Sequence, residues 1–200
     1  MTYADAVIDL VRAAGEADLS VELDTPRGDE AQLCETVFGP TFAADIGRMG
    51  YPKTFDMPWI VEDLDFYGLE DLADRQVGYR SHGITGECIP DWPEDRFVIA
   101  AWAGNPIPVG LDGSICNSMH GVGSWTFSRI APNLPSFFVL LAAWIRYFIA
   151  ERGGTLFGEE DIQAFEKMRV DIRREVLGSI AEADKDAVLA FLLGDTNRRA

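Results

Sequence analysis

The stretch from Phe97 to Leu141 places the strongest constraint on the fold, because short apolar runs alternate there with glycine-containing turns. Residues 95–104 form an apolar run with the composition of a β-strand. Asp112-Gly113 is a strong signal for a tight hairpin turn between antiparallel strands. Parallel strands need long crossovers, and the connections in this stretch are too short to provide them. The stretch therefore predicts a mostly antiparallel sheet.

The same stretch predicts how the sheet continues. We expect Gly104-Asn105-Pro106 to be a second backbone turn, and residues 123–127 to form a further short strand. A helix over residues 133–151 should begin with Asn133 as its N-cap and pack across the sheet. The expected core comprises Phe97, Ile99, Trp102, Ile107, Val109, Leu111, Phe138, Leu141 and Trp144.

Shorter elements are predicted before this region. Apolar residues at helical spacing indicate helices over residues 4–14 and 29–38, the first ended by Gly15 and the second by Gly39-Pro40. Residues 47–59 look like a loop. A short strand over 59–61 and a helical segment over 64–72 should follow.

The predicted class is α+β: a mostly antiparallel sheet flanked by helices, with a helical extension at the C-terminus. We expect a domain over residues 1–152 and an extension over 153–200. The extension contains two amphipathic segments, 159–177 and 182–193, whose apolar stripes must be covered. Packing on the same chain is the favoured arrangement, and packing on a second copy is the alternative. Monomer and homodimer are therefore both open.

Charge and composition limit the function. The net charge of −16 argues against nucleic-acid binding, which needs Lys and Arg. Three cysteines and an opening without a basic, apolar leader favour a cytoplasmic protein without disulfides. No apolar run is long enough to cross a membrane.

The acidic residues are concentrated in residues 1–100, which contain 21 Asp and Glu against 7 Lys and Arg. One interpretation is that they only keep the protein soluble, and the other is that they form a face for a basic partner. The candidate binding residues fall into a first acidic group, 62–74, and a second acidic group, 91–95. The first group is Glu62, Asp63, Asp65, Glu70, Asp71 and Asp74, and the second is Asp91, Glu94 and Asp95.

No pattern of catalytic or cofactor-binding residues is present. Cys116 and His120 have neither the paired spacing of a zinc site nor an identifiable third residue for nucleophilic catalysis. The glycines do not have the spacing of phosphate-binding loops. Carboxylates are too numerous for proximity to select a catalytic pair. We therefore expect no enzyme, metal or cofactor.

Residues 55–150 contain a Trp, a strand and turn of the form "FVIAAWAGNPI", a His-Gly, and "IAPNLPSFF" at the start of the last helix. This pattern resembles the SUKH superfamily, which includes fungal cell-wall assembly (glucan-synthesis) regulators and bacterial immunity proteins. The matching positions are Trp92, Phe97, Ile99, Ala100, Gly104, Asn105, Pro106, Ile107, His120, Gly121, Trp125, Ile130, Ala131, Leu134, Phe137 and Phe138.

This resemblance implies an α+β fold and a binding role without catalysis. With the acidic N-terminal half, it favours an immunity protein that neutralises a toxin, often a basic nuclease, in its own cytoplasm. The partner is then a protein, with the acidic groups as its contact surface. The alternatives are a regulatory scaffold of the cell-wall assembly type and a hydrolase that uses a carboxylate pair.

Overall fold

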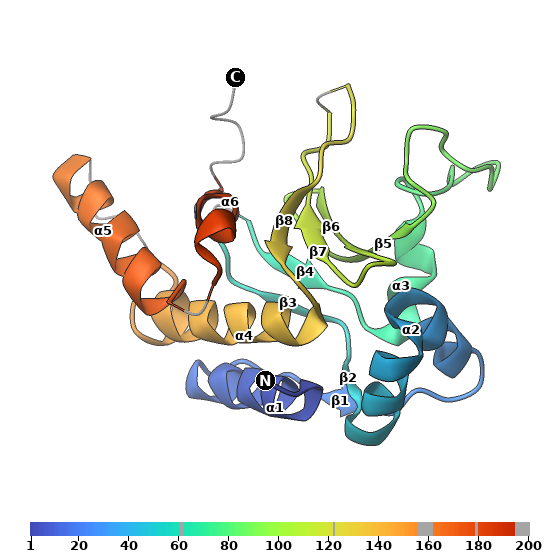
Figure 1. The fold of residues 1–200 in the computed structure, drawn as a ribbon, viewed down its shortest axis with the longest axis horizontal. Coiled ribbons are helices and arrows are strands. Elements are labelled where there is room, and N and C mark those ends of the chain that lie inside the picture. Colours follow the sequence, from blue (N-terminus) through green and yellow to red (C-terminus); the bar gives the residue numbers. More distant parts are fainter. Residues whose placement is uncertain (61, 122, 156–161, 179, 195–200) are drawn as a thin grey trace.

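The computed structural model describes residues 1–60, 62–121, 123–155, 162–178 and 180–194, and its class is α+β. Within these ranges, six antiparallel strands form one sheet in the order β3-β4-β5-β6-β7-β8, and β1 pairs with β2 (Figure 1). The strands are β1 Leu23–Asp24, β2 Tyr51–Pro52, β3 Phe55–Met57, β4 Leu64–Phe66, β5 Arg96–Trp102, β6 Asn105–Gly110, β7 Ile115–Asn117 and β8 Ser128–Ala131. The helices are α1 Tyr3–Glu16, α2 Asp29–Met49, α3 Leu69–Leu72, α4 Leu134–Trp144, α5 Ile162–Glu175 and α6 Lys185–Leu192.

The two predicted turns organise the centre of the sheet. Gly113 has a φ of 80° in the turn between β6 and β7, as the Asp-Gly signal predicts. The turn between β5 and β6 lies one residue earlier than expected. Ala103 and Gly104 occupy it with φ of 50° and 75°, while Asn105 already pairs with Trp102 as the first residue of β6. Positive φ at both central residues suits the right-handed twist of the two strands.

Helix α4 covers one face of the sheet, and α1 packs on the other side of α4 (Figure 1). The Asn133 side chain caps α4 by accepting a hydrogen bond from the Ser136 amide at 3.0 Å. The predicted helix continues beyond α4 as a π-helical turn, Ile145–Ala150. The Phe138 ring lies 5.9 Å from that of Tyr3 in α1 and 6.0 Å from that of Phe66 in β4, so it joins the three layers.

Most of the predicted core is buried, but two members are not. Leu111 is 66% exposed because it belongs to the turn after β6, where the chain has left the sheet. Phe97 is only half-buried, and the Arg80 guanidinium lies 3.8 Å above its ring. The other seven residues have side chains at most 7% exposed.

The region before β5 differs from the prediction. Residues 51–57 contain β2 and β3 where a loop was expected, and Leu64–Phe66 is a strand where a helix was expected. Leu64 and Phe66 are buried while Asp65 between them is half-buried, which is the two-residue period of a strand. Trp59 and Ile60 lie outside the strands, and position 61 of that expected strand is outside the described residues.

Three element boundaries also differ from the prediction. Gly39, with φ of 76°, interrupts α2 as predicted, but the chain resumes helical structure after it and continues to Met49. Gly15 lies in the last turn of α1 and does not end it. The last strand is β8, Ser128–Ala131, because residues 123–127 belong to the loop that precedes it.

The C-terminal helices pack on the same chain. The Phe191 ring of α6 lies 5.2 Å from that of Trp59, and Arg129 of β8 forms a two-pronged ion pair with Asp184 at 2.9 Å. Ile172 of α5 is fully buried. Residues 159–161 of the first predicted segment lie outside the described residues. The division at residue 152 stays a prediction, as does the oligomeric state.

Candidate protein-binding surface

Two loops rise from the same side of the sheet, and both come from the strands that surround its centre. The first loop, residues 77–95, leads into β5, and the second loop, of which residues 118–121 and 123–127 are described, lies between β7 and β8 (Figure 1). Their aromatic rings meet. The Trp92 ring lies 4.9 Å from the Trp125 ring and 5.6 Å from the Phe127 ring. These contacts hold two segments together that are far apart in the sequence.

The base of the first loop is fixed by hydrogen bonds to the backbone. The buried Gln76 amide donates to the Leu72 and Val98 carbonyls at 2.7 and 2.9 Å and accepts from the Val98 amide at 2.9 Å. The Trp92 indole N–H donates to the Arg96 carbonyl at 2.9 Å. These bonds satisfy the buried polar atoms and anchor both ends of the loop.

Arg80, near the start of the first loop, ties that loop to its own end and to the sheet. Its guanidinium donates to the Glu94 carbonyl at 2.9 Å while it covers the Phe97 ring. Burial lowers its pKa, and the nearby Cys88 and Glu94 partly oppose that shift. Gln76, Arg80, Cys88, Trp92 and Glu94 help to line a cavity of about 320 Å³, joined by Ser81, Ile89 and Pro90.

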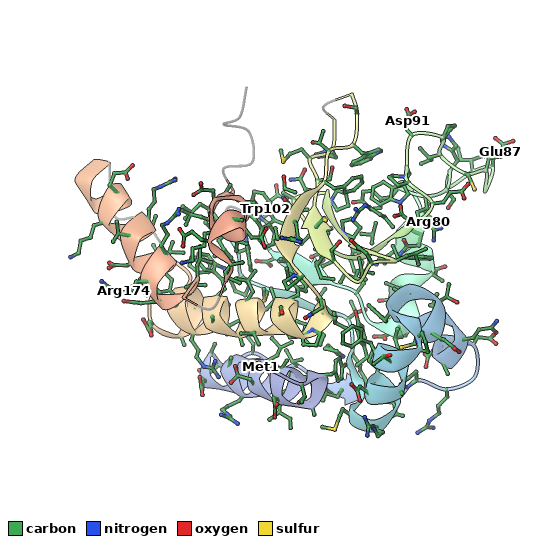
Figure 2. The ribbon with its side chains drawn as sticks, in the orientation of Figure 1. Met1, Arg80, Glu87, Asp91, Trp102 and Arg174 are labelled. Carbon is green, nitrogen blue, oxygen red and sulfur yellow. The ribbon has the colours of Figure 1, made fainter. Side chains whose placement is uncertain are left out.

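The second acidic group lies on this anchored loop. Asp91, Glu94 and Asp95 are all exposed. Figure 2 shows the carboxylates of Glu87 and Asp91 at the outer edge of the loop. Ile84, in the same loop, is fully exposed. The surface thus combines exposed carboxylates with an exposed apolar side chain.

Part of the first acidic group has contacts within the chain. Glu70 accepts a hydrogen bond from the Thr54 amide at 2.9 Å, and Asp71 accepts one from the Thr54 hydroxyl at 2.7 Å. The same hydroxyl accepts from the Gly68 amide at 2.9 Å. These bonds attach the start of α3 to the segment before β3, so Glu70 and Asp71 have a structural role.

Asp65 faces another carboxylate. It lies directly opposite Asp56 on the neighbouring strand β3. Burial raises the pKa of Asp65, and the charge of Asp56 and a hydrogen bond with it add to the shift, against the opposing effect of Arg75. The remaining members of the group, Glu62, Asp63 and Asp74, are exposed.

Cys116 and His120 have different surroundings. Cys116 is buried, with its Sγ 3.3 Å from Nη1 of Arg96. The His120 ring Nδ1 lies 3.2 Å from the Asn105 side-chain oxygen, which also accepts from the His120 amide at 3.0 Å. Within the described residues, no three His, Cys, Asp or Glu side chains are placed to hold a metal ion.

The contribution of the second loop was not predicted from the sequence, where Trp125 was named only as one of the positions that resemble the SUKH superfamily. It is only half-buried, and with Asp91 it lines an open hollow of about 200 Å³. A signal for this was available, because Trp125 follows Gly121 and Gly123 and precedes the strand. A tryptophan in a glycine-rich loop has few neighbouring side chains to bury it.

No described helix is long and apolar enough to cross a membrane.

No protein-family model, curated protein or solved structure matches this chain. The resemblance to the SUKH superfamily therefore stays a prediction.

Proposed function

We propose that this protein is a non-enzymatic binding module of the SUKH type, an immunity protein that neutralises a toxin in the cytoplasm of the cell that makes it. The observation that carries the proposal is the second acidic group, exposed on a loop whose base is fixed to the sheet. A rigid acidic surface suits a basic partner, and a nuclease has a basic cleft because it binds phosphate.

The local charges support this interpretation. Within the part of the chain that the structure describes, neither Glu87 nor Asp91 forms an ion pair. Their charges are therefore available to a partner. Complementary charge speeds association and disfavours wrong partners, while a few desolvated contacts provide most of the affinity. Ile84 and Trp125 are candidates for such contacts.

The hydrolase alternative has one observation in its favour, the Asp56–Asp65 pair. A carboxyl with a raised pKa opposite a second carboxyl is an arrangement used for acid–base catalysis. Replacement of Asp65 by Asn distinguishes the two functions, because it should abolish hydrolysis and leave toxin neutralisation intact. A regulatory scaffold stays the third candidate.

The experiment begins with the neighbouring genes, where a large secreted protein with a C-terminal toxin domain would provide the partner. Co-expression with that toxin then compares two triple variants that change the charge by the same amount. One carries Lys at Asp91, Glu94 and Asp95, and the other carries Lys at Glu62, Asp63 and Asp74. Carboxylates that accept hydrogen bonds within the described part of the chain are left unchanged, so both variants should fold.

We expect the second-group variant to lose protection and to bind the toxin more slowly, with a weaker dependence on salt. The first-group variant should protect cells almost as well as the wild type. Full protection by both folded variants would contradict a binding mode based on acidic residues. Loss of protection in the first-group variant alone would move the contact surface to residues 62–74.

A further inference from the structure

The hollow between the two loops has a chemistry of its own. Its lining comprises Asp91 from the first loop and Met119, Gly121, Gly123, Ser124 and Trp125 from the second. Its volume of about 200 Å³ is below the roughly 300–1,000 Å³ of pockets that hold drug-sized ligands. The hollow is therefore large enough for one side chain and too small for a typical cofactor.

The carboxylate and the indole in the lining indicate which kind of side chain from a partner would fit the hollow. Asp91 provides an exposed carboxylate in the lining, and Trp125 provides an aromatic wall. A carboxylate beside an indole favours a cation, because the first attracts it by charge and the second by its ring electrons. An arginine suits both better than a lysine, since its planar guanidinium stacks on rings, pairs with a carboxylate through two hydrogen bonds and is more weakly hydrated.

The wall is held in place before any ligand arrives. The Trp92 ring meets the Trp125 ring at an interplanar angle of 78°, and the Tyr79 ring lies 6.1 Å from it. Gly121 and Gly123 have φ of 76° and 85°. They add only backbone to the lining, so no side chain from these two positions obstructs the approach. A site that is ordered in advance loses less entropy when it binds.

We infer that this hollow receives an arginine side chain of the protein partner, which pairs with Asp91 and stacks on Trp125. The inference rests on the proposed function for the source of the arginine. The hollow itself can be tested with a small probe, so the two proposals can fail separately.

The probe is N-acetyl-arginine-N-methylamide, titrated into the ¹⁵N-labelled full chain at constant ionic strength. We expect chemical-shift changes at the Gly121 and Gly123 amides and at the Trp125 indole N–H. The Asp91→Asn variant should weaken binding by about twofold to fivefold, because it removes an exposed ion pair and keeps the shape. Glu87→Gln is the matched control, since it changes the same charge on the same loop outside the lining.

Equal weakening by both variants would show a general attraction to the acidic loop and overturn the inference. An equal response to the neutral N-acetyl-glutamine-N-methylamide would do the same. Trp125→Leu tests the aromatic wall independently and should weaken the arginine probe more than the lysine analogue. If the arginine probe fails to bind while the protein still protects against its toxin, the hollow is not an arginine-binding site and the proposed function stands. If arginine binds while no toxin is neutralised, the hollow stands and the immunity proposal fails.

Discussion

Asp56 and Asp65 lie directly opposite each other on β3 and β4, so two carboxylates occupy one cross-strand pair near the edge of the sheet. Like charges at such a position destabilise the sheet by roughly 0.2–1 kcal/mol. Burial and the Asp56 charge raise the pKa of Asp65, which means that the folded state holds its proton to a higher pH than the unfolded chain does.

Asp65→Asn should therefore stabilise the protein at neutral pH, by roughly 0.2–1 kcal/mol. The pKa of Asp65 is higher in the folded state than in the unfolded chain. The wild-type protein therefore loses stability as the pH rises from the unfolded-state pKa through the folded-state pKa. The gain should be present above the folded pKa and disappear as the pH falls towards 3.8, the unfolded value. Urea unfolding at a series of pH values measures it. Asp63→Asn is the control, and an equal gain there would show only a reduction of net charge.

Thr54→Val should destabilise the protein by about 1–3 kcal/mol. The change keeps the shape of the side chain but removes the hydroxyl that donates to Asp71 and accepts from the Gly68 amide. Chemical denaturation gives the free energy of unfolding. Thr36→Val removes an exposed hydroxyl bond within α2 and should cost much less. Similar losses in the two variants would mean that the Thr54 contacts contribute nothing special.

Phe191→Ala should cost about 3–5 kcal/mol, because the ring is fully buried against Trp59. The expected thermal unfolding is a single transition at a lower temperature, since α6 shares its core with the sheet. Val170 of α5 is 60% exposed, so Val170→Ala should leave the midpoint of thermal unfolding nearly unchanged. Two separate transitions in the Phe191 variant would show instead that the C-terminal helices unfold independently.

Native protein should expose one reactive thiol. Cys88 is exposed, whereas Cys34 and Cys116 are buried, and burial raises the pKa of Cys34 to about 12. Thiolate is the reactive form, so Cys34 should remain almost unreactive at pH 8. A thiol reagent should modify one cysteine quickly in the native state and three in denaturant, and Cys88→Ser should remove the fast reaction. A fast reaction that persists in this variant would contradict the burial of the other two.

The sequence predicts the sheet centre well because its signals are local. Gly104 and Gly113 each adopt positive φ in a turn of only a few residues. Asn133 caps α4 through a hydrogen bond from the Ser136 amide, three residues further along the chain. The antiparallel α+β class follows from these signals. The predicted helical segment 64–72 is right only at its end, where Leu69–Leu72 forms α3. Its first part was misinterpreted because its acidic residues resemble the outer face of a helix, whereas Asp65 is the half-buried residue of a short strand.

The candidate site was predicted only in part, for a related reason. Asp91, Glu94 and Asp95 were identified because charge density is visible along the chain. Their combination with Trp125 depends on the Trp92–Trp125 contact, which joins residues in two separate loops. No local pattern specifies such a contact. The hydrogen bonds of Glu70 and Asp71 to Thr54 are equally non-local. They show that these two carboxylates have a structural role, which the sequence did not indicate.

The aromatic contact between the loops also has a consequence for kinetics. Loops that are already packed together need not be ordered by a partner, so association there should occur in one bimolecular step. Its rate would then be governed by diffusion and the electric field of the acidic residues, and would stay proportional to partner concentration without reaching a plateau. Weakening the Trp92–Trp125 contact should introduce a slow unimolecular phase while the field, and thus the initial encounter, stays the same.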